Sequence, residues 1–150
     1  MKDLKRNCYM DKRPGIGRLW YVSVEEVQSL AVTAEDTVSV TLKPGGRWGE
    51  IHGKRTTAAS AWDRRFENRI QTTLPGWTMQ EAVGIGRLVH GRYLVKWADH
   101  AGDTWLCGYG EPMHLDISQT APDTPTEYQG LVLTFSCESE FGFLKVAENG

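Results

Sequence analysis

The sequence has no long hydrophobic run and few cysteines. Its 150 residues include three cysteines, and 40% of them are hydrophobic. The apolar runs are only a few residues long, so none could cross a bilayer as a helix. Residues 1–13, MKDLKRNCYMDKR, are charged and contain no apolar stretch, so we expect no secretory signal. We therefore predict one non-membrane domain over residues 1–150, with a charged N-terminal arm over about 1–14.

The three cysteines, Cys8, Cys107 and Cys137, do not form a recognisable framework. An odd count without a short C-x-x-C spacing predicts neither a set of disulfides nor a zinc site. Cys107 and Cys137 each lie inside a strand-like segment. We expect both to be small buried hydrophobic residues in a reducing compartment.

Motifs for catalysis are also missing. There is no G-x-S-x-G nucleophile elbow, and the four histidines lack metal-ligand spacing. Glu138 and Glu140 could form a glycosidase-like pair, but such a pair is more often part of a solvated strand edge that prevents strand addition. We predict no enzyme activity, no cofactor and no metal, and a small hydrolase is the weakest alternative.

Charge is distributed unevenly along the chain, although the net charge is only −2. Residues 1–98 contain 16 basic and 10 acidic residues and so have a net charge of +6. Residues 99–150 contain one basic and nine acidic residues and have a net charge of −8. Opposite charges in the two halves favour head-to-tail association of identical subunits. The alternative is that folding brings the two halves together and cancels the asymmetry. The opposite charges also argue against a protein that coats DNA, which would usually be basic throughout.

Hydrophobic residues alternate with polar ones over several short segments, which is typical of half-buried strands. Residues 62–73 are ambiguous, because Trp62, Phe66 and Ile70 also recur at helical spacing. We interpret this stretch as a strand, with a helix as the alternative. The other expected strands cover residues 17–22, 37–42, 92–98, 104–110, 112–118 and 128–137.

Turn residues separate these strands. DHAGD at 99–103 predicts a hairpin between two of them, and KPGGRWG at 43–49 predicts a second turn. Two prolines predict an exposed loop over 119–126. Helix is limited to residues 24–30 and a turn near Leu88. The predicted fold class is all-β, a β-sandwich or barrel with at most one or two short helices.

Six tryptophans are many for this length. Trp97 and Trp105 are predicted to face each other across the hairpin. Trp48 and Trp77 lie beside glycines in turns, so we expect these two to be exposed. We favour packing in the core and at interfaces as the role of the tryptophans. Stacking of exposed indoles on sugar rings makes a carbohydrate-binding module a rival hypothesis.

The C-terminal half carries a pattern of strands and turns. An F-E pair at Phe66-Glu67 is followed by a strand ending in D-x-x-G at Gly102 and by a return strand ending at Gly108. A Pro-led strand begins at Glu111-Pro112, and a Y-x-G-h-x-h-x-F strand covers residues 128–135, where h is hydrophobic. This pattern is similar to small tail proteins of tailed bacteriophages and of prophages from gut anaerobes.

The resemblance implies a non-enzymatic structural protein of the virion tail, made in the host cytoplasm. Its expected partners are copies of itself, in tail-tube-like rings through which DNA passes without sequence-specific binding, and neighbouring tail proteins. A terminator, distal tail or neck adaptor remains an alternative. An acidic C-terminal half could line the lumen, because negative charge repels phosphate. The candidate assembly contacts are Trp48, Trp77, Lys2, Lys5, Arg6 and Arg13.

Overall fold

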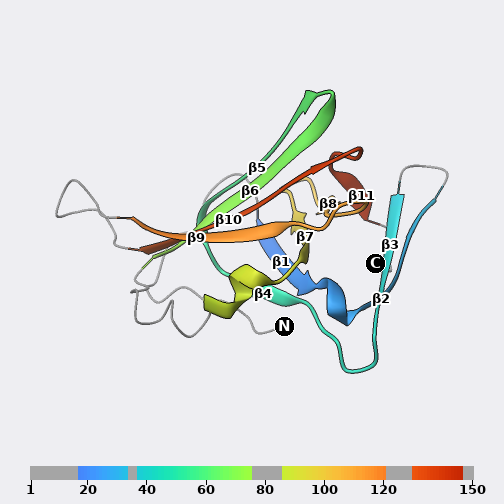
Figure 1. The fold of residues 1–150 in the computed structure, drawn as a ribbon, viewed down its shortest axis with the longest axis horizontal. Coiled ribbons are helices and arrows are strands. Elements are labelled where there is room, and N and C mark those ends of the chain that lie inside the picture. The colour runs from blue at the N-terminus through green and yellow to red at the C-terminus, as the bar shows by residue number, and fades with distance from the viewer. Residues whose placement is uncertain (1–16, 34–36, 76–85, 121–129, 147–150) are drawn as a thin grey trace.

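The computed structural model describes residues 17–33, 37–75, 86–120 and 130–146 (Figure 1). These residues form strands in two sheets and two short 3-10 helices, η1 (Val24–Glu26) and η2 (Gly86–His90). The predicted all-β class with at most two short helices is therefore confirmed. None of the helices in the described ranges is long and apolar enough to cross a membrane.

Sheet A has seven strands in the order β2-β3-β11-β8-β7-β1-β4. Neighbours are antiparallel, except that β3 and β11 are parallel. The strands are β1 (Arg18–Ser23), β2 (Val27–Val32), β3 (Thr37–Leu42), β4 (Gly49–Ile51), β7 (Tyr93–Ala98), β8 (Thr104–Cys107) and β11 (Leu144–Val146).

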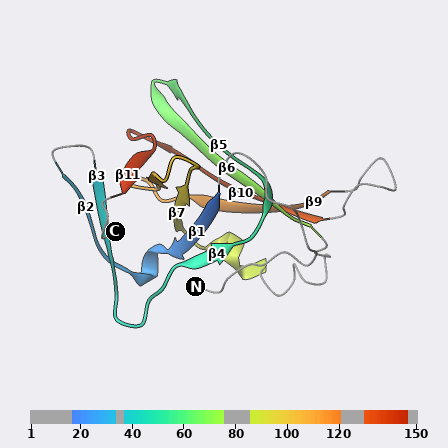
Figure 2. The same cartoon turned by 180° about the vertical axis from the view of Figure 1, so that it is seen from behind.

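Sheet B has four antiparallel strands in the order β5-β6-β10-β9. They are β5 (Lys54–Asp63), β6 (Arg65–Pro75), β9 (His114–Thr120) and β10 (Gly130–Ser139). Both views show the β5–β6 hairpin extending beyond the rest of the molecule (Figures 1 and 2). The two open sheets resolve the predicted alternatives in favour of a sandwich-like architecture.

The main core lies between the two sheets. Alternate residues of each strand point inward, as pleated geometry requires. Tyr21 of β1, Tyr93 of β7 and Phe135 of β10 form its centre, with ring centroids 5.7–6.3 Å apart. Their burial joins both sheets into one hydrophobic cluster.

A second cluster covers the opposite face of sheet A. Val22 and Leu94 neighbour inward-facing residues on their strands, so their side chains point away from sheet B. They pack with Leu106 and with Val38 and Val40 of β3. Sheet A is therefore buried on both faces over part of its width.

The hairpin of β7 and β8 forms as predicted, with Trp97 paired opposite Trp105. Asp99 closes its turn by accepting hydrogen bonds from the backbone N–H groups of Ala101 (2.9 Å) and Asp103 (3.0 Å). The second carboxylate oxygen accepts from the Trp105 indole N–H at 3.0 Å. The turn residues thus organise the strand ends, as their chemistry predicts.

Most of the other predicted elements are confirmed. Residues 62–73 are extended, with the hairpin tip at Arg64, so the helix alternative is wrong. The turn after β3 uses Gly45 at a φ of +83°, a conformation that glycine adopts freely. The turn near Leu88 is η2, and the alternating burial of β10 matches its sequence pattern.

Two predictions need correction. The helix expected over residues 24–30 is one 3-10 turn, capped by Ser23, followed by β2. Backbone pairing of β2 with β3 overrides the local helical pattern, because alternate residues of the antiparallel pair exchange ladder hydrogen bonds. The loop expected from residue 119 starts later, because β9 continues through Thr120. The remainder of that loop lies outside the described residues.

Candidate assembly surface

Sheet B has one buried face and one polar face. On β6, Asn68, Ile70, Thr72 and Leu74 are buried in the interior. The alternate residues of the same strand carry charge at Arg65, Glu67 and Arg69, and all three are exposed. The outer face of sheet B is therefore solvated and of mixed charge.

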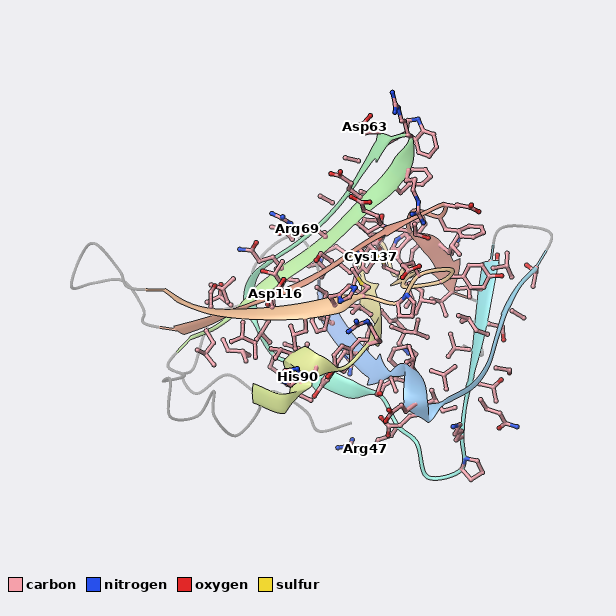
Figure 3. All side chains as sticks on the ribbon, in the orientation of Figure 1. Arg47, Asp63, Arg69, His90, Asp116 and Cys137 are labelled. Atoms are coloured by element: carbon pink, nitrogen blue, oxygen red, sulfur yellow. The ribbon has the colours of Figure 1, made fainter. Side chains whose placement is uncertain are left out.

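The tip of the β5–β6 hairpin carries an exposed indole. Trp62 is 65% exposed, and its ring lies 4.9 Å from that of Phe66, its partner across the hairpin. Between them the chain turns at Arg64, which adopts a φ of +67°, uncommon for a residue other than glycine. Figure 3 places Asp63 at this tip, far from Arg47 and His90. A large apolar side chain is thus presented away from the core.

Strand β5 is an edge of sheet B. Within the described residues, no strand pairs with its outer side. Residues 56–62, TTAASAW, contain no charge and no proline. Natural edge strands usually carry a charged residue or a proline, because either feature blocks pairing with another chain. The edge is interrupted by an irregularity between Lys54 and Thr57. From there to the tip it is regular and unprotected.

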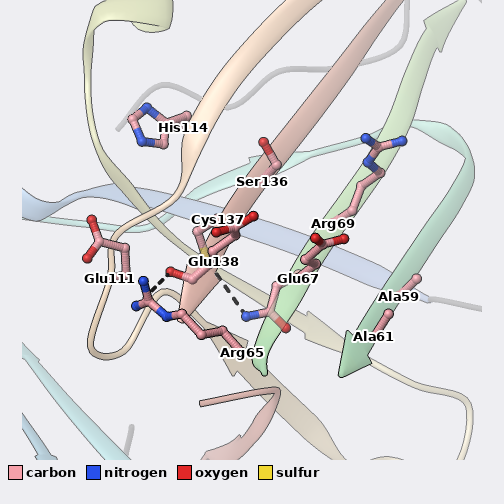
Figure 4. Close-up of a pocket in the computed structure, with 11 residues that line it drawn as sticks. Ala59, Ala61, Arg65, Glu67, Arg69, Glu111, His114, Ser136, Cys137 and Glu138 are labelled. Carbon is pink, nitrogen blue, oxygen red and sulfur yellow. Dashed lines mark hydrogen bonds between the residues drawn. The ribbon is translucent and has the colours of Figure 1, made fainter. Parts of the chain in front are cut away.

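A groove of about 870 Å³ lies on the outer face of sheet B (Figure 4). We call it the sheet B groove. Alanines and a serine form its small side chains, and three glutamates, two arginines and a histidine supply its charge. The lining residues are Ala59, Ala61, Arg65, Glu67, Asn68, Arg69, Glu111, His114, Ser136, Cys137 and Glu138. Within the described ranges, no group of three or more His, Cys, Asp or Glu side chains is arranged to hold a metal ion.

Asn68 anchors the end of this groove. Ser60 Oγ donates a hydrogen bond to its Oδ1 at 2.6 Å. Its Nδ2 donates to the carbonyl oxygen of Phe141 at 3.0 Å and to Cys137 Sγ at 3.7 Å. A buried amide with these partners connects β5, β6 and β10 to the segment that follows β10. The tip half of the β5–β6 hairpin, where Ser60 pairs with Asn68, is thereby fixed to the sandwich.

The structure corrects the expectation for Trp48, which is only partly exposed. The ammonium of Lys96 lies 4.2 Å from the ring centroid of Trp48 and 5.1 Å from that of Trp20. Burial of Lys96 lowers its pKa, and the charge of Arg18 lowers it further. Arg18 itself forms a two-point ion pair with Glu50, at 2.9 and 3.0 Å. Trp48 is therefore held by cation–π contact at the edge of sheet A.

The remaining predicted contacts, Trp77, Lys2, Lys5, Arg6 and Arg13, lie outside the described residues. Sequence reasoning missed β5 as a strand and therefore missed the tip. Thr56 and Thr57 are typical of strands, but the alanines that follow are not, so alternation alone did not identify it. Glu138 and Glu140 are both exposed, Glu138 on β10 and Glu140 just after it.

Comparison with known proteins adds no relative. No family model, no curated protein and no solved structure matches this chain significantly. The two-sheet all-β fold and its open surface are therefore the basis for a functional argument.

Proposed function

We propose that this chain is a non-enzymatic structural subunit of a phage tail that assembles with copies of itself. The observation that carries the proposal is the unprotected edge of β5, which ends at the exposed Trp62. The sequence resemblance to small tail proteins supplies the setting, a virion tail. The finer role, a tube-like ring that DNA passes through, rests on that resemblance and on the charge asymmetry of the chain.

The β5 edge suits strand pairing between subunits. An open edge exposes unpaired N–H and C=O groups that can extend a neighbour's sheet. In a free monomer such an edge is an aggregation hazard. In a closed ring the neighbouring subunit covers this edge, and the lack of charge at positions 56–62 then permits strand pairing between subunits.

A closed ring needs two different surfaces on each subunit, because head-to-tail contacts are not self-complementary. Among the described edge strands, β2 is the one that carries no charge over its whole length, with the sequence VQSLAV, whereas β5 lacks charge over residues 56–62. Strand β4 carries Glu50, and β9 carries His114 and Asp116. The β5 edge and the β2 edge therefore form a candidate pair of complementary surfaces.

The test is the assembly state of the purified chain. Negative-stain microscopy and light scattering after size-exclusion chromatography should show rings or short tubes. Ala61→Lys places a charge on the unprotected edge and should shift the protein to monomers. Trp62→Gln should weaken assembly by removing the apolar tip.

Ser118→Lys is the matched control, because Ser118 is exposed on the outer face of the other edge strand of sheet B. It makes the same charge change and should leave the rings intact. Circular dichroism must show all three variants folded. A wild-type chain that stays monomeric at high concentration, or an Ala61→Lys variant that assembles normally, would disprove the proposal.

A further inference from the structure

Two cysteines that are 30 positions apart in the sequence meet in the core. Cys107 ends β8 of sheet A, and Cys137 lies on β10 of sheet B. Both are free thiols that belong to the cluster between the sheets. Their side chains are in hydrogen-bond contact, with Cys107 as the donor. Burial was predicted from the sequence, but their proximity across the two sheets was not.

The two thiols differ in access. Cys107 is 1% exposed, whereas Cys137 is 8% exposed and lines the sheet B groove (Figure 4). The reason lies in the strand pairing. Strand β9 begins at His114, opposite Ser136, so β10 has no β9 partner beyond that residue. The resulting opening lets a small molecule in the groove approach Cys137 before it reaches Cys107.

Their surroundings separate the thiols chemically as well. The hydrogen bond from Cys107 and a second one from the Asn68 amide lower the pKa of Cys137 to about 7. Burial and the charge of Glu111 raise the pKa of Cys137, whereas the charge of Arg65 lowers it. The pKa of Cys107 is raised, because it holds the shared proton and is buried. Near neutral pH, Cys137 is therefore the nucleophile of the pair.

We propose that Cys137 and Cys107 are a redox modification site, at which a hydroperoxide oxidises Cys137 and Cys107 converts it into a disulfide that joins the two sheets. A low-pKa thiol that is reached from a groove and touches a second thiol is the arrangement of peroxide-sensitive cysteines. This inference concerns the folded subunit and does not depend on how, or whether, it assembles.

The reaction balances in two steps. The Cys137 thiolate attacks one oxygen of the peroxide, an S–O bond forms, and the O–O bond breaks to release water or an alcohol after protonation. Cys107 then attacks the sulfur of the sulfenic acid. An S–S bond forms, the S–O bond breaks, and the hydroxyl leaves with the Cys107 proton as water. Two thiols are oxidised and one peroxide is reduced.

The disulfide should reinforce the sandwich, because it crosslinks strands from both sheets. Closing a loop of about 30 residues restricts the unfolded chain, and we expect the melting temperature to rise by roughly 10 °C. Reduction by a dithiol should reverse the change. The subunit would then be less stable under reducing conditions and more stable under oxidising ones.

The experiment treats the reduced protein with hydrogen peroxide and maps its peptides by mass spectrometry. Cys8→Ser is the matched control, because it removes the third thiol and leaves the pair intact. Wild type and Cys8→Ser should both give an intramolecular Cys107–Cys137 crosslink, with the rise in melting temperature. Its rate of formation should increase as the pH rises through about 7. Cys107→Ala should stop at a sulfenic acid, trapped with dimedone, and Cys137→Ala should not react at that site.

Several outcomes would overturn the inference. They are crosslinks that require Cys8, accumulation of sulfinic acid on Cys137 without a disulfide, or no modification of Cys137 at peroxide excess. The wild type and Cys8→Ser decide these outcomes even if the two core variants fail to fold.

Discussion

The two sheets differ in how many faces they bury. Sheet A has a hydrophobic cluster on each face, one built around Tyr21 and one around Leu106. Sheet B has a single buried face, and its other face is charged and grooved. Although both sheets have alternating strands, only sheet A is covered on both sides over part of its width. Sheet B is therefore the part of the described molecule that is open to contacts.

The same contrast applies to the edges. Sheet B places two of its three longest strands, β5 and β6, in a hairpin that projects from the body (Figure 1). Sheet A ends in the three-residue strand β4 on one side and in the six-residue strand β2 on the other. A three-residue edge strand such as β4 offers few hydrogen-bonding groups to a partner, whereas the ten-residue β5 offers many. Substitutions on the different faces should therefore separate stability from assembly.

Phe135→Ala tests the core shared by both sheets and should cause the largest loss of stability. Phe135 is fully buried and contacts the rings of Tyr21 and Tyr93. Its truncation should lower the free energy of unfolding by about 4 kcal/mol, measured by chemical denaturation. Val132→Ala on the outer face of the same strand is the control and should cost far less. Similar losses for both would show that the two faces of β10 are not distinct.

Leu106→Ala tests the second cluster, on the opposite face of sheet A. Leu106 is fully buried with Val22, Val38 and Leu94. We expect a loss of about 3 kcal/mol in the free energy of unfolding, because the cavity is lined by strands that cannot collapse easily. Both variants should unfold in one cooperative transition if the clusters belong to one domain. Two separate transitions would contradict a single domain.

Much of this fold could be predicted from local patterns. The strands at 37–42 and 128–137 alternate clearly, and the hairpin at 92–110 has a turn with glycine and aspartate. These signals lie within a few residues of one another, so no long-range information is needed. The alternating burial of β10 follows directly from the same pattern.

The candidate surface was harder to predict, because it depends on contacts between distant segments. Trp48 looked exposed in its glycine-rich turn, but Lys96 of another strand lies against its ring. Residues 24–30 look helical, but β3 pairs with Val27, Ser29 and Leu30. The contact between Cys107 and Cys137 arises only when the two sheets pack. None of these partners is close in the sequence.

A smaller loss of stability is expected from replacing Asp99, which lies in the β7–β8 turn at one end of sheet A. The Trp105 indole N–H, followed by backbone N–H groups, lowers the pKa of its carboxyl below the ordinary value of 3.8. A lowered folded-state pKa means that the ionised carboxylate stabilises the fold above that ordinary value. This stabilisation is lost as the pH falls below 3.8 through the folded-state pKa. Asp99→Ala should therefore be less stable than wild type at pH 7, with the difference shrinking in acid, as thermal melts at several pH values would show.

The smallest effect on stability is expected from the outer face of sheet B. Glu67 and Arg69 are exposed, and exposed charges contribute little to folding. The double variant Glu67→Ala/Arg69→Ala should change the free energy of unfolding by less than about 0.5 kcal/mol. If this face touches a neighbouring subunit, the same variant should still alter assembly, measured by light scattering. A loss of more than about 2 kcal/mol would mean that these side chains support the fold. The contrast between a doubly covered sheet A and a half-open sheet B would then fail.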